Sequence, residues 1–421
     1  MKEYLFDCAV IGGGAAGMAA ALEVEKAGFK TAIIEREECL GGILLQCIHN
    51  GFGLHEFKEE LTGPEYAERF ADKIDESEVK VFLDSTVMEM DEPADYPGQH
   101  ELYCYSSVYG VFVIRARTVI LAMGCRERNR GNIGIPGTRP SGIMTAGLAQ
   151  RLVNIDGYVP GKDIVIIGSG DIGLIMARRM TWAGCRVHAV IEIQPYPSGI
   201  TRNIVQCLED FEIPLYLSHV VSEIRGKDRI ESILVTPNKD GYPDEENSFE
   251  LKCDTLLLSV GLVPENELSR KAGIDLNPQI NGPYVDSHLM TNKDGVFACG
   301  NVLHVHDLVD YVSAESRSAG SNAVKFLQSA LTGKQYSVKS GANVRYIVPQ
   351  KFNFSDDNRF YLRSMIVKNE AVVEIKADGR TIKTIKHSHV QPSEMISIKL
   401  KRADLEKISD LPDPRLEISI I

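Results

Sequence analysis

The sequence predicts an α/β protein in which one kind of strand–helix unit occurs twice and a small β-rich domain follows. A short apolar strand runs into a glycine-rich turn at residues 10–17, and the pattern returns 156 residues later at 164–173. Each turn precedes a helical stretch and a second apolar strand that ends in an acid. Each unit later has another apolar strand that ends in glycine, at 119–124 and 256–261. Because strands that alternate with helices form parallel sheets, we expect two Rossmann-like domains.

The spacing within each glycine-rich turn is that of a dinucleotide-binding motif. The first glycine permits the tight turn, the second lets the backbone approach a pyrophosphate, and the third lets the helix pack close to the strand. These glycines are Gly12, Gly14 and Gly17 in the first turn, and Gly168, Gly170 and Gly173 in the second. The acids Glu35 and Glu192 follow at 23 and 24 positions, where a carboxylate accepts hydrogen bonds from a ribose. A carboxylate repels a 2′-phosphate, so Glu192 favours NAD over NADP.

The composition narrows the function further. The net charge of −12 argues against nucleic acid as a partner. No apolar run approaches the roughly 20 residues that cross a bilayer, so we expect no transmembrane segment. Residues 1–3 lead directly into an apolar strand, so we expect no signal peptide and a cytoplasmic protein. Nine cysteines are scattered without a CxxC pair, which favours reduced thiols over disulfides or an iron–sulfur site.

The order of these motifs resembles that of the two-dinucleotide-binding flavoprotein superfamily, which includes glutathione-reductase-like and thioredoxin-reductase-like enzymes. The resemblance covers about residues 4–330 and implies that the first unit binds FAD and the second binds NAD(H). It implies that the FAD-binding domain is interrupted and resumes at residues 291–301, where Asn301 replaces an aspartate that hydrogen-bonds the ribityl chain. The expected domains are 1–150 with 275–333 for FAD, 151–274 for NAD, and 334–421 as a β-rich tail.

The matched motifs imply which residues hold the two cofactors. The expected FAD-binding residues are Gly12, Gly14, Ala15, Ala16, Gly17, Glu35, Arg36, Gly41, Gly42, Val87, Ala122, Gly124, Gly300 and Asn301. The expected NAD-binding residues are Gly168, Gly170, Asp171, Ile172, Gly173, Glu192 and Gly261. Hydride transfer between a nicotinamide and a flavin needs positioning and exclusion of water more than reactive side chains, so the catalytic residues are left unassigned.

Three further stretches, 41–53, 136–147 and 300–307, are similar to those of a narrower group of flavoprotein subunits. This group includes FAD/NAD subunits encoded beside glycerol-3-phosphate dehydrogenases and, more distantly, subunits of hydrogen cyanide synthase, opine oxidase and dye-linked proline dehydrogenase. Such proteins work in complexes in which another subunit oxidises the substrate. The resemblance therefore implies that the partner is a flavoprotein dehydrogenase subunit, with a homo-oligomer as an alternative.

Five residues are candidates for positions near the flavin: Gln46, Cys47, His49, His304 and His306. The sequence has neither the Cys-x4-Cys of disulfide reductases nor the CxxC of thioredoxin reductases, so a dithiol relay is not expected. Cys47 fits either a single redox cysteine or, more commonly, a small buried hydrophobe. The pattern His304-x-His306-Asp307 fits a polar cluster beside the flavin better than a metal site, and no metal is expected.

The tail, residues 334–421, has the pattern of a small β domain. Two alternating runs, 372–377 and 380–386, flank Asp378-Gly379, a dipeptide that suits a hairpin turn, and 395–400 is a third alternating run. The tail has 16 basic and 11 acidic residues, a net charge of +5, whereas residues 1–333 carry −17. We expect this basic domain to help hold the partner, with the chain's own acidic body and a second copy as alternatives.

Three functions compete on these observations. The leading hypothesis is an NADH-linked FAD-dependent subunit that exchanges electrons with a partner dehydrogenase. The first rival is a stand-alone NADH oxidase or peroxidase that uses Cys47. The second rival is a scaffold subunit whose second site holds a nucleotide without catalysis.

Overall fold

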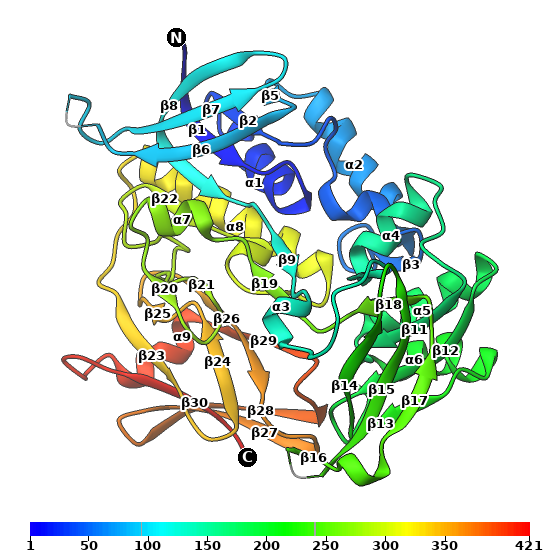
Figure 1. Ribbon diagram of the computed structural model, residues 1–421. Coiled ribbons are helices and arrows are strands. Elements are labelled where there is room, and N and C mark those ends of the chain that lie inside the picture. Colours follow the sequence, from blue (N-terminus) through cyan, green and yellow to red (C-terminus); the bar gives the residue numbers. More distant parts are fainter. Residues whose placement is uncertain (94, 240) are drawn as a thin grey trace. The chain divides into compact units, whose positions relative to one another are not determined.

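The computed structural model describes residues 1–93, 95–239 and 241–421 (Figure 1). The chain forms two compact units, Met1–Cys125 with Pro264–Ile421, and Arg126–Val263. The second unit therefore begins before the expected boundary at 150 and ends before the expected boundary at 274. The reason is β10 (Ile143–Thr145), which pairs in parallel with β18 (Thr255–Leu258), and α4 (Ala146–Asn154), which follows it into the core of the second unit.

The first unit is built on a sheet of seven strands. The order is β5 (Lys80–Phe82), β2 (Thr31–Ile34), β1 (Lys2–Ile11), β8 (Gly110–Leu121), β7 (His100–Ser106) and β6 (Ser85–Asp91), and β22 (Val296–Ala298) also pairs with β8. The strands β5, β2, β1, β8 and β22 are parallel, and β7 and β6 are antiparallel. Because β22 pairs with residues 119–121, the segment after residue 264 returns to the sheet that holds the first glycine turn.

Helices and short elements complete this unit. The helices are α1 (Ala15–Lys26), α2 (Gly63–Asp75), α7 (Glu267–Lys271) and α8 (Val309–Leu327), with 3-10 turns at Gly42–Gln46 and Gly300–Val302. Short strands are β3 (Asn50–Phe52), β4 (Leu61–Thr62), β20 (Leu276–Asn277) and β21 (Gly282–Pro283). The helix α1 is rich in alanine, and its buried face includes Ala19 and Ala20, so α8 can pack closely beside it. The chain crosses between the units in β9 (Cys125–Glu127) and β19 (Leu262–Pro264).

The second unit has a parallel sheet in the order β10, β18, β11 (Asp163–Ile167), β12 (Arg186–Glu192) and β13 (Leu215–Leu217). The helices α4, α5 (Asp171–Trp182) and α6 (Thr201–Cys207) share a hydrophobic core with this sheet. A second sheet of β14 (His219–Gly226), β15 (Ile230–Lys239), β16 (Tyr242–Pro243) and β17 (Phe249–Lys252) shares another core with it, and α3 (Arg130–Ile133) is a short helix near the start of the unit. The parallel sheet and its helices match the predicted Rossmann-like unit, but an antiparallel sheet rather than a second layer of helices covers the other face.

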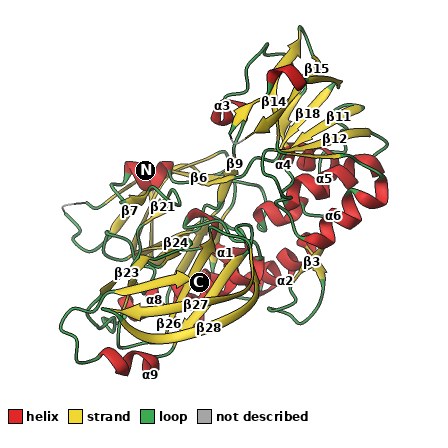
Figure 2. Cartoon of the chain, turned by 90° about the horizontal axis from the view of Figure 1, so that it is seen from below, coloured by secondary structure: helices red, strands yellow, loops and turns green. Residues whose placement is uncertain are grey.

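The tail forms two sheets around a core of its own (Figure 2). One sheet has the order β25 (Lys351–Phe352), β23 (Tyr336–Ser340), β30 (Leu416–Ile420), β27 (Lys368–Ala377) and β28 (Arg380–Val390). The other contains β24 (Val344–Val348), β26 (Asn358–Ser364) and β29 (Met395–Leu400), and α9 (Arg402–Leu405) follows. The predicted hairpin is confirmed: Ala377 pairs with Arg380, and Asp378 and Gly379 both adopt the positive φ that this turn requires.

The tail packs on the rest of the first unit, to which it belongs. Tyr346 and Val348 in β24 belong to the core of the first unit rather than to that of the tail. Arg363 in β26 forms an ion pair with Asp307 and donates to the backbone oxygen of Val305. The backbone N–H of Met395 donates to the same Asp307 carboxylate at 2.7 Å. Of the three docking partners considered for the basic tail, the acidic body of this chain is therefore one that it does contact.

Within the described part of the chain, no helix is both long and apolar enough to cross a membrane.

The shared core leads to a test of stability. Val348 lies in the tail but is fully buried in the core of the first unit, whereas Val367, also in the tail, is exposed. We expect Val348→Ala to lower the free energy of unfolding of the first unit by about 2 kcal/mol, because burying a valine side chain contributes about that much. Val367→Ala is the matched control and should change it by less than about 0.5 kcal/mol. Urea denaturation followed by circular dichroism measures both, and equal effects would show that the tail does not complete this core.

Candidate functional site

The first glycine turn is closed on two sides by backbone and open on the third. Gly12 has φ +107°, and a Cβ there would lie 2.5 Å from the Ala122 carbonyl oxygen. A Cβ on Gly17 would lie 1.8 Å from the Gly12 oxygen, so no side chain fits at either position. A Cβ on Gly14 would meet only the Gly42 Cα, at 4.0 Å. The free space beside Gly14 is what a backbone that must approach a ligand needs.

The N-terminus of α1 opens onto the same place. Gly14 is the N-cap and provides no side-chain hydrogen bond to the first turn of the helix. The backbone N–H groups of this turn, at Ala15 and Ala16, therefore lack the capping oxygen that a serine or aspartate would supply. Together with the positive end of the helix dipole, they can bind a phosphate.

The acid predicted to bind a ribose is held against this turn. Glu35 is buried, and one of its carboxylate oxygens accepts from the Gly13 N–H at 2.6 Å while the other accepts from the Glu37 N–H at 2.9 Å. Gly41 forms a bridge with Gly14, and Gly42 follows it. Most of the FAD-binding residues predicted from the sequence therefore lie around one turn.

The remaining predicted residues differ in position. Gly300 reaches this turn from the returning segment, since a Cβ there would lie 2.8 Å from the Ala16 Cβ. Gly124 follows β8 with φ +73° and open space beside it. Arg36 is largely exposed and pairs with Glu37. Val87 lies on β6, where it pairs with Cys104. No contact in the described structure brings Arg36 or Val87 to the glycine turn.

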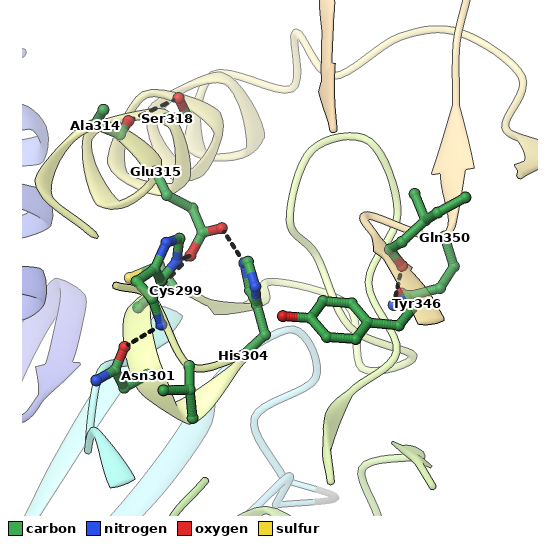
Figure 3. A network of polar contacts seen from close by, with 12 residues as sticks. Cys299, Asn301, His304, Ala314, Glu315, Ser318, Tyr346 and Gln350 are labelled. Carbon is green, nitrogen blue, oxygen red and sulfur yellow. Dashed lines mark hydrogen bonds and ion pairs between the residues drawn. The ribbon is translucent and has the colours of Figure 1, made fainter. Parts of the chain in front are cut away.

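The returning segment carries a buried polar cluster (Figure 3). Glu315 in α8 accepts from the Gly300 N–H at 2.7 Å, and its two oxygens lie 2.8 Å from Nε2 of His304 and 3.1 Å from Nε2 of His306. Asn301 accepts from the His306 N–H at 3.0 Å and donates through Nδ2 to the Cys125 sulfur. The side-chain oxygen of Asn301 thus holds the turn in place, and its second lone pair can accept a hydrogen bond from a ligand.

The charges in this cluster follow from burial and pairing. Burial lowers the pKa of His304 to about 4, helped by the neighbouring His306 and opposed by Glu315. Burial alone would raise the pKa of Glu315, but the two imidazoles hold it well below its usual range. The sequence indicated His304 and His306 but missed Glu315. The available signal was an acid among small residues, Ser313, Ala314 and Ser316, on a helix face that packs inward.

The other flavin-proximal candidates lie in and after the 3-10 turn Gly42–Gln46. Gln46 is buried, and Nδ1 of His49 is 3.1 Å from the Asn50 oxygen. The Cys47 thiol donates to the Ile43 oxygen at 3.3 Å, and burial raises the pKa of Cys47 to about 12. A redox cysteine reacts as a thiolate, so this environment disfavours the peroxidase rival.

The second glycine turn repeats the shape of the first. A Cβ on Gly168 would lie 2.0 Å from the Ser259 oxygen, and one on Gly173 would lie 2.3 Å from the Gly168 oxygen. Gly170 has no atom within 4 Å of its Cβ position, as expected where a ligand approaches. Gly261 has positive φ and equally open space. Ile172 packs against the hydrophobic core of the second unit.

The second glycine turn differs from the first in the acidic residues beside it. Glu192 is buried and accepts from the N–H and the hydroxyl of Ser169, at 2.9 and 2.6 Å, and from the Gln194 N–H at 2.9 Å. Asp171 stands in the first turn of α5 and accepts from the Ile200 N–H and the Asn203 amide. A carboxylate at this point makes the helix start less positive than that of α1, which weakens its attraction for a phosphate.

Comparison with known proteins places these sites in a family. The model of the pyridine nucleotide-disulphide oxidoreductase family matches residues 6–330. The hydrogen cyanide synthase subunit HcnB of Pseudomonas protegens is 27% identical over 294 residues, which cover 64% of this chain and 59% of that protein. An opine oxidase subunit of Agrobacterium tumefaciens is 24% identical over 315 residues, 70% of this chain and 61% of that protein.

A solved structure supports the fold. The crystal structure of T. acidophilum thioredoxin reductase matches 77% of this chain and 98% of its own, with a TM-score of 0.61 at 23% identity. The predicted α/β class with two Rossmann-like sheets is confirmed. The predicted superfamily is also confirmed, and so is the similarity to hydrogen cyanide synthase and opine oxidase subunits. This chain spans about 60% of the length of these two relatives.

Gly14 has open space beside it whereas Gly17 does not, so the same substitution should have different effects at the two positions. Gly14→Ala should leave the stability of the FAD-free protein unchanged but weaken FAD binding at least tenfold, about 1.4 kcal/mol, because the new methyl meets only the ligand. Gly17→Ala should destabilise the protein itself, because its methyl collides with backbone. Thermal unfolding without FAD and FAD titration separate the two effects. Unchanged FAD affinity in a folded Gly14→Ala protein would place the ligand elsewhere.

Proposed function

This chain belongs to the pyridine nucleotide-disulphide oxidoreductase family, and on that premise we propose that it is an NADH-linked, FAD-dependent subunit that exchanges electrons with a partner dehydrogenase. Members of this family are oxidoreductases that use FAD and a pyridine nucleotide, which gives the chain its enzyme class and cofactors. The partner and the direction of electron transfer are the new parts of the proposal. The first partner to test is a dehydrogenase of the glycerol-3-phosphate type.

The observation that carries the proposal is the open side of the first glycine turn, where Gly14, the uncapped start of α1 and Gly300 meet. We assign the FAD pyrophosphate to this place and the adenosine ribose to Glu35. When bound, FAD supplies an acceptor for the hydride of a reduced nicotinamide. The chain's own residues bind and orient: the N–H groups of Ala15 and Ala16 face the phosphate, and Asn301 offers its free lone pair.

The second turn is assigned to NAD(H) for a matching reason. Gly170 leaves the backbone open, and the Glu192 carboxylate stands where a 2′-phosphate would be repelled. The neighbouring Asp171 adds negative charge to the same turn. We therefore expect moderate affinity for the nucleotide and a clear preference for NADH over NADPH.

The cysteines indicate that electrons leave the flavin by a route other than a dithiol. Among the residues that the structure describes, none of the nine cysteines forms a disulfide. Burial keeps Cys47 protonated, and Cys8 and Cys299 have raised pKa values for the same reason. Without a redox-active thiol pair, the reduced flavin must pass its electrons to another acceptor, and we propose that this acceptor is a partner protein. Both relatives, HcnB and the opine oxidase protein, are themselves named as subunits.

A candidate contact surface lies in the second unit. Leu148, Ile155, Tyr158 and Val159 are all about half exposed or more, within twelve residues of chain. Such a density of exposed apolar side chains is uncommon on a surface that only water covers. We assign the 148–159 segment to the partner interface. The tail remains a second candidate for holding the partner, since its contacts within this chain do not test that prediction.

The first test is reduction of the flavin. In anaerobic mixing, NADH should bleach the bound flavin at least tenfold faster than NADPH at equal low concentration, and Glu192→Gln should narrow this gap by removing the repelling charge. Gly170→Ala should slow reduction by NADH while leaving FAD affinity unchanged. Cys47→Ser should leave the rate unchanged, and a large loss would favour the peroxidase rival. A nucleotide that binds without reducing the flavin would favour the scaffold rival.

The second test is the partner. The chain is expressed with its genomic neighbours, purified through its own tag at low salt, and each copurifying subunit is identified. We expect a dehydrogenase to copurify, and Tyr158→Ser to reduce its yield severalfold. Tyr242→Ser is the matched control, because Tyr242 is a still more exposed tyrosine in the same unit. Copurification of no dehydrogenase contradicts the subunit proposal, and equal loss with both variants contradicts the 148–159 interface.

A further inference from the structure

The buried cluster of His304, His306 and Glu315 holds the Gly300–Val302 turn through a hydrogen bond to Gly300, and the proposed function does not yet use it. We call these three residues the carboxylate cluster. All three side chains are almost fully buried, with Glu315 only 2% exposed. Glu315 comes from α8, and the two histidines come from the loop between the Gly300–Val302 turn and α8 (Figure 3).

The carboxylate cluster fixes the shape of the turn that we assign to FAD. Glu315 binds the Gly300 N–H at 2.7 Å, and the His306 N–H binds the Asn301 side chain at 3.0 Å. Gly300 has φ +69° and lies against Ala16 in the first turn of α1. Without the hydrogen bond from the Gly300 N–H to Glu315, the turn could move away from the place assigned to the pyrophosphate.

Hydrogen bonding defines the protons in the carboxylate cluster. Glu315 is an acceptor, so each imidazole points a hydrogen on Nε2 toward it. The Nδ1 atoms of both histidines are buried and have no partner among the residues that the structure describes. A neutral imidazole leaves only a lone pair there, whereas a protonated one would bury an N–H without an acceptor.

The same observation disfavours a metal ion. The three side chains offer nitrogen and oxygen atoms within 4.8 Å of one another, a grouping that could surround an ion. An ion bound to both Nε2 atoms would move the ring hydrogens to Nδ1, where they find no acceptor among the described residues. Hydrogen-bond distances of 2.8 and 3.1 Å already satisfy the carboxylate.

Apart from Glu315, no described residue around the two imidazoles would stabilise a positive charge on either ring. Tyr346 from β24 and Tyr361 from β26 place their rings about 5–6 Å from the imidazoles. Arg363 from β26 is paired with Asp307 and donates to the Tyr346 hydroxyl at 3.1 Å. The charge of Arg363 itself disfavours protonation of His304. Glu315 is thus the only acid in direct contact with the imidazoles among the described residues.

We propose that Glu315 and the imidazoles of His304 and His306 are positioning residues that hold the Gly300–Asn301 turn in the shape that binds FAD, so that FAD is released when acid protonates His304. The proposal rests on the assignment of FAD to the first unit. It requires no reaction at the imidazoles themselves. It adds a condition for cofactor binding: the carboxylate cluster must be intact, with His304 uncharged.

The direction of the pH effect follows from linkage. The pKa of His304 is about 4 in the closed turn and about 6.5 when the histidine is exposed. The closed turn therefore has its full stability above about pH 6.5 and loses it as the pH falls toward 4. If FAD binds only the closed turn, its dissociation constant should be higher at pH 5.5 than at pH 7.5, by up to about tenfold where the open turn predominates in the free protein. The lowered pKa of Glu315 acts in the same direction at lower pH.

The experiment measures FAD dissociation constants at pH 7.5 and 5.5 by flavin fluorescence. His304→Gln keeps a neutral donor toward Glu315, so it should bind FAD within about threefold of the parent at pH 7.5 and lose most of the pH dependence. Glu315→Gln replaces one of the two acceptor oxygens by an NH2 donor that faces another donor, so it should weaken binding at least tenfold at both values. His188→Gln removes a histidine–carboxylate pair in the second unit, with Nε2 2.8 Å from Asp163, and should behave as the parent.

Nitrogen NMR of the FAD-free protein gives a second readout. It should show the His304 imidazole neutral at pH 7.5 with hydrogen on Nε2. The proposal is overturned if His304→Gln keeps the pH dependence, if the NMR shows a charged His304 imidazole at pH 7.5, or if purified protein holds a stoichiometric metal ion that Glu315→Gln removes. A protein that binds FAD with this pH dependence but is not reduced by NADH would refute the proposed function and leave the carboxylate cluster as assigned.

Discussion

Contact between backbone atoms at two glycines is the constraint on which the rest of the structure depends. Gly17 must come so close to Gly12 that a methyl group would lie 1.8 Å from its oxygen, and Gly173 approaches Gly168 in the same way. Because helix and strand pack at this distance, the first turn of each helix faces outward from the end of the sheet. The pairing of β22 with β8 then brings Gly300 to the first of these turns. Cofactor binding is thus a consequence of how closely two elements can pack.

The sequence was most informative where local spacing determines structure. Gly12, Gly14 and Gly17 perform three different steric roles, and those roles depend on residues only a few positions apart. The Asp378–Gly379 hairpin is local for the same reason. The domain boundaries were less predictable, because β10 joins the second sheet through pairing with β18, more than a hundred residues later. The assignments of Arg36 and Val87 to FAD came from family resemblance rather than from spacing, and they stay predictions.

The parts that the sequence did not reveal all depend on distant contacts. Glu315 looks like a solvent-exposed helix residue until α8 is packed and His304 is brought to it. The position of the tail depends on the contacts of Tyr346, Val348 and Arg363, which belong to no recognisable sequence motif. The tail contacts Asp307 of the body, but its net charge alone could not choose between this chain and another protein as its neighbour.

Hydrogen–deuterium exchange with and without FAD tests the central claim most directly, that the first glycine turn and the returning turn form one FAD site. We predict that FAD slows exchange in residues 12–18 and 299–306 together, and leaves residues 168–173 unchanged. Protection of residues 168–173 by FAD, or protection of residues 12–18 while 299–306 exchange as before, would contradict the account.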